Sequence, residues 1–144
     1  MASIKRNGSA VWTGSLKEGK GSISTGSGVL KETPYGFGTR FEGAPGTNPE
    51  ELIGAAHAGC FSMALSAKLG EAKLTPEKIA TTATVSLEKG EKGFAITAVH
   101  LDVSAKIPGA TAEQFQTIAS DAKANCPVSK VLNASITLDA TLAS

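Results

Sequence analysis

The segment from Asn48 to Leu69 constrains the fold most, because it reads as one long helix that is apolar nearly all round. Asn48 can cap the helix, Pro49 suits its first turn, and Glu51 stands at the capping-box distance. Gly70 is the expected signal for its end. Its central sequence is LIGAAHAGCFSMALSA. Because no polar face is evident, we predict a helix that is buried on all sides.

This segment is not expected to cross a membrane. The uncharged stretch that starts at Leu52 and ends before Lys68 is short for a span, and it contains His57, Ser62 and Ser66. The N-terminal sequence MASIKRNGSAVW lacks the apolar stretch of a signal peptide. We therefore predict a soluble, cytoplasmic protein.

The composition suits one globular domain over residues 1–144, with 41% hydrophobic and 19% charged residues. The formal net charge is +1 and no long run of Lys or Arg stands out, so nucleic acid is not an expected partner. The chain has two cysteines. In a reducing compartment they are not expected to form a permanent disulfide, which leaves redox chemistry, metal binding or packing.

The flanking segments predict strands. Before the helix, short apolar–polar alternations around Ala10–Thr13, Ser22–Ser24 and Tyr35–Phe41 indicate strands joined by glycine turns. After it, Thr82–Leu87 and Phe94–Ile107 read as a β-hairpin. The apolar phase of the second strand changes near Thr97, where a bulge would fit. The inward face is predicted to hold Val99, Leu101, Val103, Ala105 and Ile107.

The remaining sequence predicts two helices and a final strand. Thr111 can cap a helix whose apolar side holds Phe115, Ile118, Ala119 and Ala122. Asn125-Cys126-Pro127 breaks that helix and can start another, PVSKVL. The last strand alternates Ile136, Leu138, Ala140 and Leu142 with polar residues. Strands around separate helices make the predicted fold class α+β.

Each cysteine has two interpretations. Cys60 lies mid-way along the apolar helix, where a free cysteine is often a small core residue, but its small neighbours leave space for a ligand or another helix. Cys126 precedes Pro127 at a predicted helix N-terminus, where backbone N–H groups favour the thiolate, although it could equally be a simple cap. The spacing does not show whether the two meet.

Other polar residues are weaker candidates. His57 lies three residues before Cys60 on the same helix side, but no spacing supports a zinc site, so it is expected to pack or to line a pocket. His100 is expected at the surface. Arg40, in GTRFEG, would by itself be a surface ion-pair residue, and Glu50 is not needed to cap the helix.

NPEELIGAAHAGCF, followed far downstream by NCPVSKVL, resembles the osmotically inducible protein C and organic hydroperoxide resistance family. GKGSISTGSGVL and PYGFGTRFEG resemble its osmotically inducible protein C branch. The resemblance implies an intertwined α+β homodimer, with antiparallel strands packed around a long central helix. It also implies a peroxidase that prefers organic hydroperoxides and uses no metal or cofactor.

The resemblance assigns roles by position. Cys60 would be the peroxidatic cysteine and Cys126 the resolving one, while Glu50 and Arg40 would be the family carboxylate and arginine. The arginine would lower the pKa of Cys60 and bind the peroxide oxygen. The reductant would be an external dithiol, as on lipoylated proteins. Gly59, where alanine is usual, is a small departure.

Two further expectations concern the surroundings of Cys60. An apolar wall that favours bulky hydroperoxides would include Ile53, His57, Phe61 and Met63. Glu50 and Cys60 lie ten residues apart, or about 15 Å along one helix, so we expect Glu50 to serve the partner subunit. The small residues Gly54, Ala55, Ala58 and Gly59 would let two such helices pack closely.

Two other functions remain open from the sequence. The chain could be a non-catalytic relative that binds an apolar ligand, with Cys60 as a packing residue. It could also be a redox-sensing or structural dimer whose disulfide forms without turnover.

Overall fold

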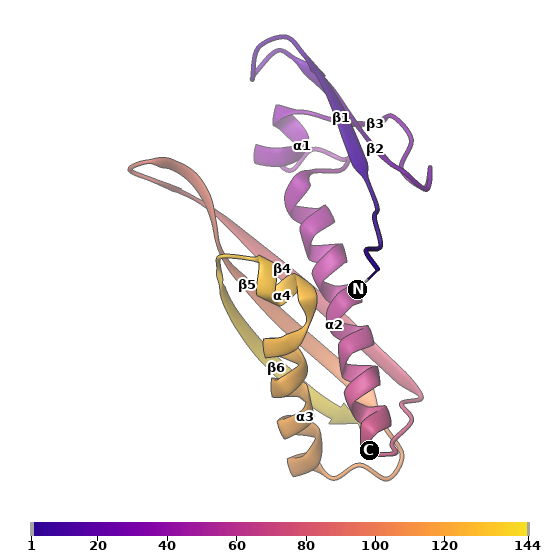
Figure 1. The fold of residues 1–144 in the computed structure, drawn as a ribbon. Helices are drawn as coiled ribbons and strands as arrows, with labels where there is room; N and C mark the ends of the chain where they lie inside the picture. The colour runs from indigo at the N-terminus through magenta and orange to yellow at the C-terminus, as the bar shows by residue number, and fades with distance from the viewer. Residues whose placement is uncertain (1, 144) are drawn as a thin grey trace. The chain divides into compact units, whose positions relative to one another are not determined.

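The computed structural model describes residues 2–143, in two compact units that divide after Leu52 (Figure 1). The long helix α2 (Pro49–Glu71) starts in the first unit and continues in the second. Both units mix helix and strand, which agrees with the predicted α+β class. A single domain over residues 1–144 stays a prediction.

The first unit is built on an antiparallel sheet of three strands in the order β1-β2-β3. Its elements are β1 (Gly8–Thr13), β2 (Lys20–Thr25), β3 (Thr33–Tyr35), α1 (Phe37–Phe41) and the start of α2. Trp12 and Tyr35 lie across from the same residue of β2, and their ring centroids are 5.5 Å apart. This pairing puts two aromatic rings together on one side of a small sheet.

The prediction of a strand over Tyr35–Phe41 is wrong, because the chain leaves β3 at Tyr35 and forms the short helix α1. Thr39 Oγ1 accepts a hydrogen bond from the Gly36 backbone N–H at 2.9 Å and donates one to the Gly36 carbonyl at 3.0 Å. These bonds close the first helical turn. Phe37 and Phe41, one turn apart, then meet with ring centroids 4.9 Å apart.

The second unit contains the predicted hairpin, β4 (Lys78–Gly90) and β5 (Gly93–Lys106). Ser86 pairs with Ala98 and Leu87 with Ile96, so Thr97 is the extra residue of the predicted bulge. One pairing departs from the antiparallel expectation: β6 (Ser135–Ala143) lies parallel to β5. Parallel neighbours need a long connection, and the segment between these two strands holds two helices.

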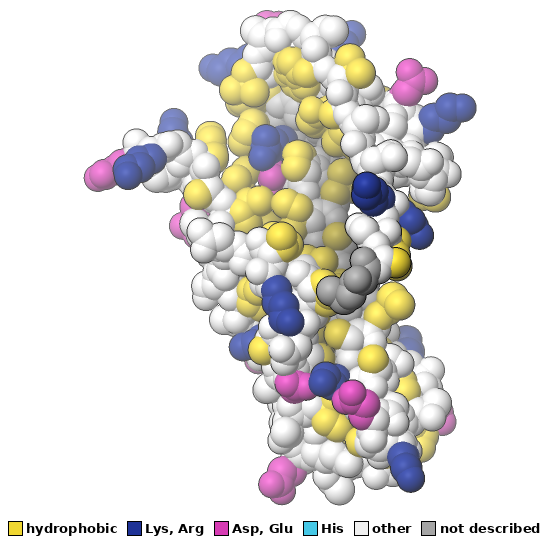
Figure 2. All heavy atoms as spheres, viewed as in Figure 1, with side chains coloured by type: hydrophobic (Ala, Val, Ile, Leu, Met, Phe, Trp, Pro, Cys, Tyr) yellow, Lys and Arg dark blue, Asp and Glu magenta, His cyan; other side chains and the backbone are white. Residues whose placement is uncertain are grey.

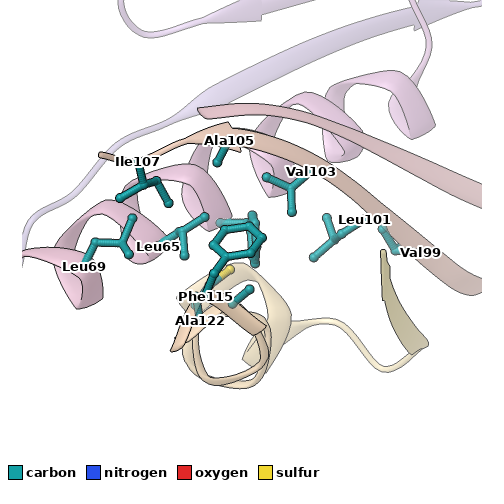
Figure 3. Packing of buried hydrophobic residues seen from close by; sticks show 12 residues of the cluster. Leu65, Leu69, Val99, Leu101, Val103, Ala105, Ile107, Phe115 and Ala122 are labelled. Atoms are coloured by element: carbon teal, nitrogen blue, oxygen red, sulfur yellow. The ribbon is translucent and has the colours of Figure 1, made fainter. Parts of the chain in front are cut away.

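These two helices are α3 (Ala112–Asn125) and α4 (Pro127–Val131). Together α2, β5 and α3 enclose the core of the second unit, with Phe115 at its centre (Figure 3). The predicted inward face of β5 is buried in full, and α3 contributes Phe115, Ala119 and Ala122. The alternation in β6 is also confirmed, since its apolar residues are half-buried and the polar residues between them are exposed.

The N-terminal cap of α2 is confirmed. Asn48 Oδ1 accepts from the Glu51 backbone N–H at 2.8 Å, and the Asn48 amide also donates to the Glu51 carboxylate. The helix continues through Gly70 to Glu71, and the left-handed residue behind it is Lys73. It is thus slightly longer than predicted.

The burial of α2 differs from the prediction, because only one side of the helix is covered. Phe61, Leu65 and Leu69 are fully buried in the core of the second unit. The opposite side is exposed along its length, and it consists mainly of small residues and one methionine: Ala55, Ala56, Gly59, Met63, Ala67 and Gly70. Apolar side chains also reach the surface elsewhere (Figure 2).

By length and composition alone, α2 would be sufficient to cross a membrane, which the sequence analysis did not expect. Core helices of soluble proteins meet the same criterion. Phe61, Leu65 and Leu69 place one side of α2 in the core, so we identify α2 as a core helix of the second unit.

Candidate active site

The two cysteines meet in the second unit. Cys60 lies on α2 and is half-buried, whereas Cys126 lies between α3 and α4 and is fully buried. Both are free thiols, and they lie close enough for each to shift the pKa of the other. The fold therefore brings together two residues that the sequence alone did not connect.

Local backbone structure explains the position of Cys126. Its own backbone is extended, with φ −63° and ψ 134°, so α3 ends there and α4 begins at Pro127. Cys126 Sγ caps α4 and accepts hydrogen bonds from Ser129 N and Ser129 Oγ, each at 3.4 Å. The predicted placement of Cys126 at a helix N-terminus is confirmed.

The two thiols are shifted in opposite directions. Burial raises the pKa of Cys60, and the neighbouring Cys126 raises it further, while a hydrogen bond from the Val128 backbone opposes this shift. Burial also acts to raise the pKa of Cys126, but hydrogen bonds from Ser129 and from the Val128 backbone leave the pKa of Cys126 below its ordinary value. Among the described residues, no cation contributes to either shift.

His57 lies one turn before Cys60 on α2 and is fully buried. Its Nε2 is 2.8 Å from Ser129 Oγ, so it contacts the same serine that bonds Cys126. Its Nδ1 has no hydrogen-bond partner among residues 2–143. Burial lowers the pKa of His57, which favours the neutral imidazole. His57 is a candidate from the sequence pattern, but its partner Ser129, 72 residues away, is not.

Arg40 and Glu50 form an ion pair within the first unit. Arg40 Nε donates to Glu50 Oε1 at 3.0 Å and Arg40 Nη2 donates to Glu50 Oε2 at 2.9 Å, which is a bidentate geometry. The carboxylate side chain is 11% exposed and the arginine side chain 34% exposed. Glu51, not Glu50, takes part in the helix cap, so Glu50 is free to hold the guanidinium.

The first unit also has an apolar pocket beside this arginine, of about 270 Å³. Arg40 is its charged residue, and the Arg40 guanidinium carbon lies 5.4 Å from the centroid of the Phe41 ring. The remaining lining residues are Trp12, Leu16, Tyr35, Gly36, Phe37 and Phe41. This pocket could not be predicted from the sequence pattern, because the alternation around Phe37 indicates a strand instead of α1.

The four residues of the predicted apolar wall have different surroundings. Phe61 is buried in the core, His57 is bonded to Ser129, and Ile53 is half-buried. Met63 is 77% exposed, on the uncovered side of α2. Their role in binding substrate stays a prediction.

Within residues 2–143, no three His, Cys, Asp or Glu side chains are grouped so that they could hold a metal ion. His57 and Cys126 share Ser129 as a hydrogen-bond partner. His100 is at the surface, where it bonds Thr137 and Asp139 of β6.

Comparison with known proteins gives consistent matches. The family described as OsmC-like protein matches residues 41–141. Peroxiredoxin OsmC of Escherichia coli strain K12 is 60% identical over 141 residues, which are 98% of this chain and 99% of that protein. The organic hydroperoxide resistance protein of Xanthomonas axonopodis pv. citri strain 306 is 31% identical over 102 residues, 70% of each chain.

Solved structures agree with the sequence comparison. An organic hydroperoxide resistance protein from Elizabethkingia anophelis has a TM-score of 0.73 to this chain at 28% identity, and the match covers 99% of this chain and 100% of that one. The predicted α+β fold is therefore confirmed.

Proposed function

We propose that this chain, which belongs to the OsmC-like protein family, is a peroxiredoxin-like enzyme that reduces organic hydroperoxides at Cys60. The peroxidase class follows from the identity with peroxiredoxin OsmC over nearly the whole length of both proteins. The observation that carries the proposal is the pair of free thiols at Cys60 and Cys126, which lie close enough to shift each other's pKa.

In the first step, the Cys60 thiolate attacks the terminal oxygen of the hydroperoxide. An S–O bond forms and the O–O bond breaks, so Cys60 becomes a sulfenic acid and the peroxide is reduced. The leaving alkoxide takes up the proton that the thiol lost, which gives the alcohol. This step needs the thiolate, because the thiol is a poor nucleophile.

In the second step, Cys126 condenses with the Cys60 sulfenic acid and water leaves. The disulfide protects Cys60 from further oxidation to irreversible acids. An external dithiol then reduces the disulfide by thiol–disulfide exchange and becomes a disulfide itself. We infer that this dithiol is carried by a lipoylated protein, which rests on the family resemblance.

A cation must still favour the Cys60 thiolate, since burial and Cys126 both raise the pKa of Cys60. Arg40 is the proposed source. Because its guanidinium is held by Glu50, the two residues would enter a site together. Glu50 is ten residues before Cys60 on α2, about 15 Å along the axis and about 80° around it.

We therefore place the Arg40–Glu50 pair of one subunit at the Cys60 of a homodimer partner. Two α2 helices packed antiparallel would bring the start of one near the middle of the other. The uncovered side of α2, with Ala55, Ala56 and Gly59, allows such an approach. Gly54 was predicted to belong to this surface, but it faces Ala83 and Val85 of β4 in the same subunit.

The apolar pocket beside Arg40 would then receive the organic group of the substrate. Its aromatic lining fits a bulky hydrocarbon, and each Å² of apolar surface buried contributes about 25 cal/mol. Hydrogen peroxide has no group to bury there. The enzyme is therefore expected to prefer organic hydroperoxides.

The test is steady-state consumption of cumene hydroperoxide and of hydrogen peroxide, with dihydrolipoamide as the reductant. We expect sustained turnover and a higher kcat/KM for cumene hydroperoxide. A non-catalytic, ligand-binding relative would not lose its Cys60 thiol on addition of the hydroperoxide. A redox-sensing dimer would lose the thiol once but would not turn over. Either result would contradict the proposal.

A further inference from the structure

His57, Ser129 and Cys126 form a continuous chain of side chains between α2 and α4. His57 Nε2 lies 2.8 Å from Ser129 Oγ, and Ser129 Oγ lies 3.4 Å from Cys126 Sγ. Both ends of the chain, the imidazole and the Cys126 thiol, are fully buried. Neither His57 nor Ser129 has a role in the mechanism above.

The directions of these hydrogen bonds can be assigned from their donors. The Ser129 hydroxyl has one hydrogen, which it donates to Cys126 Sγ, so Ser129 Oγ must accept from His57 Nε2–H. A neutral imidazole has one N–H, which leaves Nδ1 as an acceptor without a hydrogen. This agrees with the surroundings of Nδ1, which has no partner among the described residues.

An imidazolium ion would fit this position poorly. It would place a charge in a buried site and direct a second N–H, at Nδ1, where no acceptor lies among residues 2–143. Burial also lowers the pKa of His57. The neutral histidine therefore acts as a donor at Nε2, and hydrogen bonds in such a chain strengthen one another.

We propose that His57 is a positioning residue that, through Ser129, stabilises the Cys126 thiolate during disulfide closure. The inference rests on the proposed function. In this step Cys126 Sγ attacks Cys60 Sγ, the S–S bond forms and the S–O bond of the sulfenic acid breaks. Hydroxide leaves and takes up the proton that Cys126 had released, so the net product is water. The Cys126 sulfur is oxidised and the Cys60 sulfur is reduced.

A purely structural link between α2 and α4 would require the same contacts, so the test must measure the thiol itself. We suggest measuring the rate of Cys126 alkylation by iodoacetamide against pH in a Cys60→Ser background. This background removes Cys60, the other titratable thiol that acts on Cys126. Within the hydrogen-bonded series His57–Ser129–Cys126, His57 is the remaining titratable residue besides Cys126 itself, and the His57 variants test it directly.

Replacing Ser129 with alanine removes the hydroxyl donor to Cys126, so the midpoint of the alkylation profile should move to higher pH. At a pH below the midpoint, the fraction of Cys126 present as thiolate should be about tenfold smaller. Ser129→Thr keeps a hydroxyl and should keep the midpoint close to that of the background. His57→Leu should raise the midpoint in the same direction as Ser129→Ala, and His57→Gln, which retains an N–H donor, should raise it less. If His57→Leu does not fold, the smaller rise expected for His57→Gln against the background still tests His57, while Ser129→Ala against Ser129→Thr tests the link to Cys126.

A second measurement follows disulfide closure with Cys60 present. After one equivalent of cumene hydroperoxide, Ser129→Ala should accumulate sulfenic acid and close the disulfide about tenfold more slowly than Ser129→Thr. An unchanged alkylation midpoint in either Ser129→Ala or folded His57→Leu would overturn the inference, even if the wild type reduces peroxide. Failure of the wild type to consume peroxide would instead overturn the proposed function, while the alkylation profile would still test the hydrogen-bond chain.

Discussion

At the scale of single residues, Cys60 and Cys126 are close neighbours with different polar surroundings. Cys126 accepts hydrogen bonds from Ser129 and caps a helix, and its pKa lies below the ordinary value. Burial, the largest influence on Cys60, raises its pKa. The thiol that we propose as the attacking group is thus the one whose thiolate needs stabilising by another group, which is the role proposed for Arg40.

The two cysteines should therefore differ when each is replaced. Cys60→Ser should abolish peroxidase activity, because no nucleophile remains at the attacking position. Cys126→Ser should still react once, leave a sulfenic acid on Cys60, and overoxidise with excess peroxide. Mass spectrometry after one and after ten equivalents of peroxide would distinguish these states, because each oxygen atom added to Cys60 increases the protein mass by about 16 Da. Full activity in Cys60→Ser would contradict the whole assignment.

The buried His57 should make the stability of the protein depend on pH. Burial lowers the pKa of His57 in the folded state, so the unfolded state binds a proton first as the pH falls. The stabilisation from a neutral His57 is present above the unfolded pKa of about 6.5 and is lost progressively below it, by up to about 1.4 kcal/mol per pH unit.

Denaturant unfolding between pH 8 and pH 5, in steps of about one unit, would measure this loss. The matched control is His57→Gln, which cannot titrate and should lose less stability over the same range. Parallel pH profiles for the two proteins would show that His57 does not contribute.

At the scale of elements, α2 has one side in the core and one side uncovered. Phe61, Leu65 and Leu69 attach it to the second unit. Gly54 allows it to approach β4 closely, since a Cβ placed there would lie 3.0 Å from the Ala83 carbonyl oxygen. A Cβ at Gly59 or Gly70 would meet no atom within 4 Å among the described residues. Glycines in one helix therefore have different roles.

We expect Gly54→Ala to destabilise the protein by about 1–3 kcal/mol, because the new methyl group forces α2 away from backbone that cannot easily move. Gly70→Ala is the matched control on the same helix. It has open space around it and should raise stability by up to about 1 kcal/mol through its better helix propensity. Chemical denaturation of both variants would measure the difference, and equal effects would contradict the role of Gly54.

At the scale of the whole molecule, we propose an active site that two chains share. The Arg40–Glu50 pair belongs to the first unit, whereas the thiols belong to the second, and Glu50 is separated from Cys60 by about 15 Å of helix. The uncovered side of α2 offers a surface on which a second copy could pack. A two-fold dimer would repeat the same contact twice and complete two sites.

Subunit mixing tests this arrangement. Cys60→Ser and Glu50→Ala homodimers should each have little activity, for different reasons. After subunit exchange, a mixed dimer would have one site with both defects and one site with neither, so up to about half of the wild-type activity per mixed dimer should return. If no activity returns although exchange is shown by mass spectrometry, Glu50 would have to serve its own subunit.

A disruptive change on the uncovered side of α2 tests the surface itself. Gly59→Glu should place a charge in the proposed interface, so the protein should sediment as a monomer and lose peroxidase activity. The control is Gly28→Glu, which adds the same charge in a surface turn and should leave the oligomeric state unchanged. Because Gly28 has a positive φ, this control is expected to lose some stability. An active monomer of Gly59→Glu would contradict the shared site.

The sequence by itself determined the features that depend on nearby residues. The Asn48 cap, the bulge at Thr97 and the alternation in β6 follow from patterns a few residues long, and each was predicted correctly. Cys126 at the start of α4 belongs to the same group, because Pro127 marks a helix start. Such features are local, so their energetic causes are visible in the chain itself.

Only the tertiary structure decided the contacts between distant segments. Three contacts join residues far apart in sequence: the parallel pairing of β6 with β5, the approach of Cys60 to Cys126, and the contact of His57 with Ser129. The helix at Phe37–Phe41 also escaped prediction, because the Thr39 hydrogen bonds that close its first turn outweigh the apolar–polar alternation. For the long-range contacts, the physical reason is that they depend on which surfaces pack together, and a pattern along one segment does not contain that information. Helix α1 is instead the outcome of a local competition that the alternation alone does not reveal.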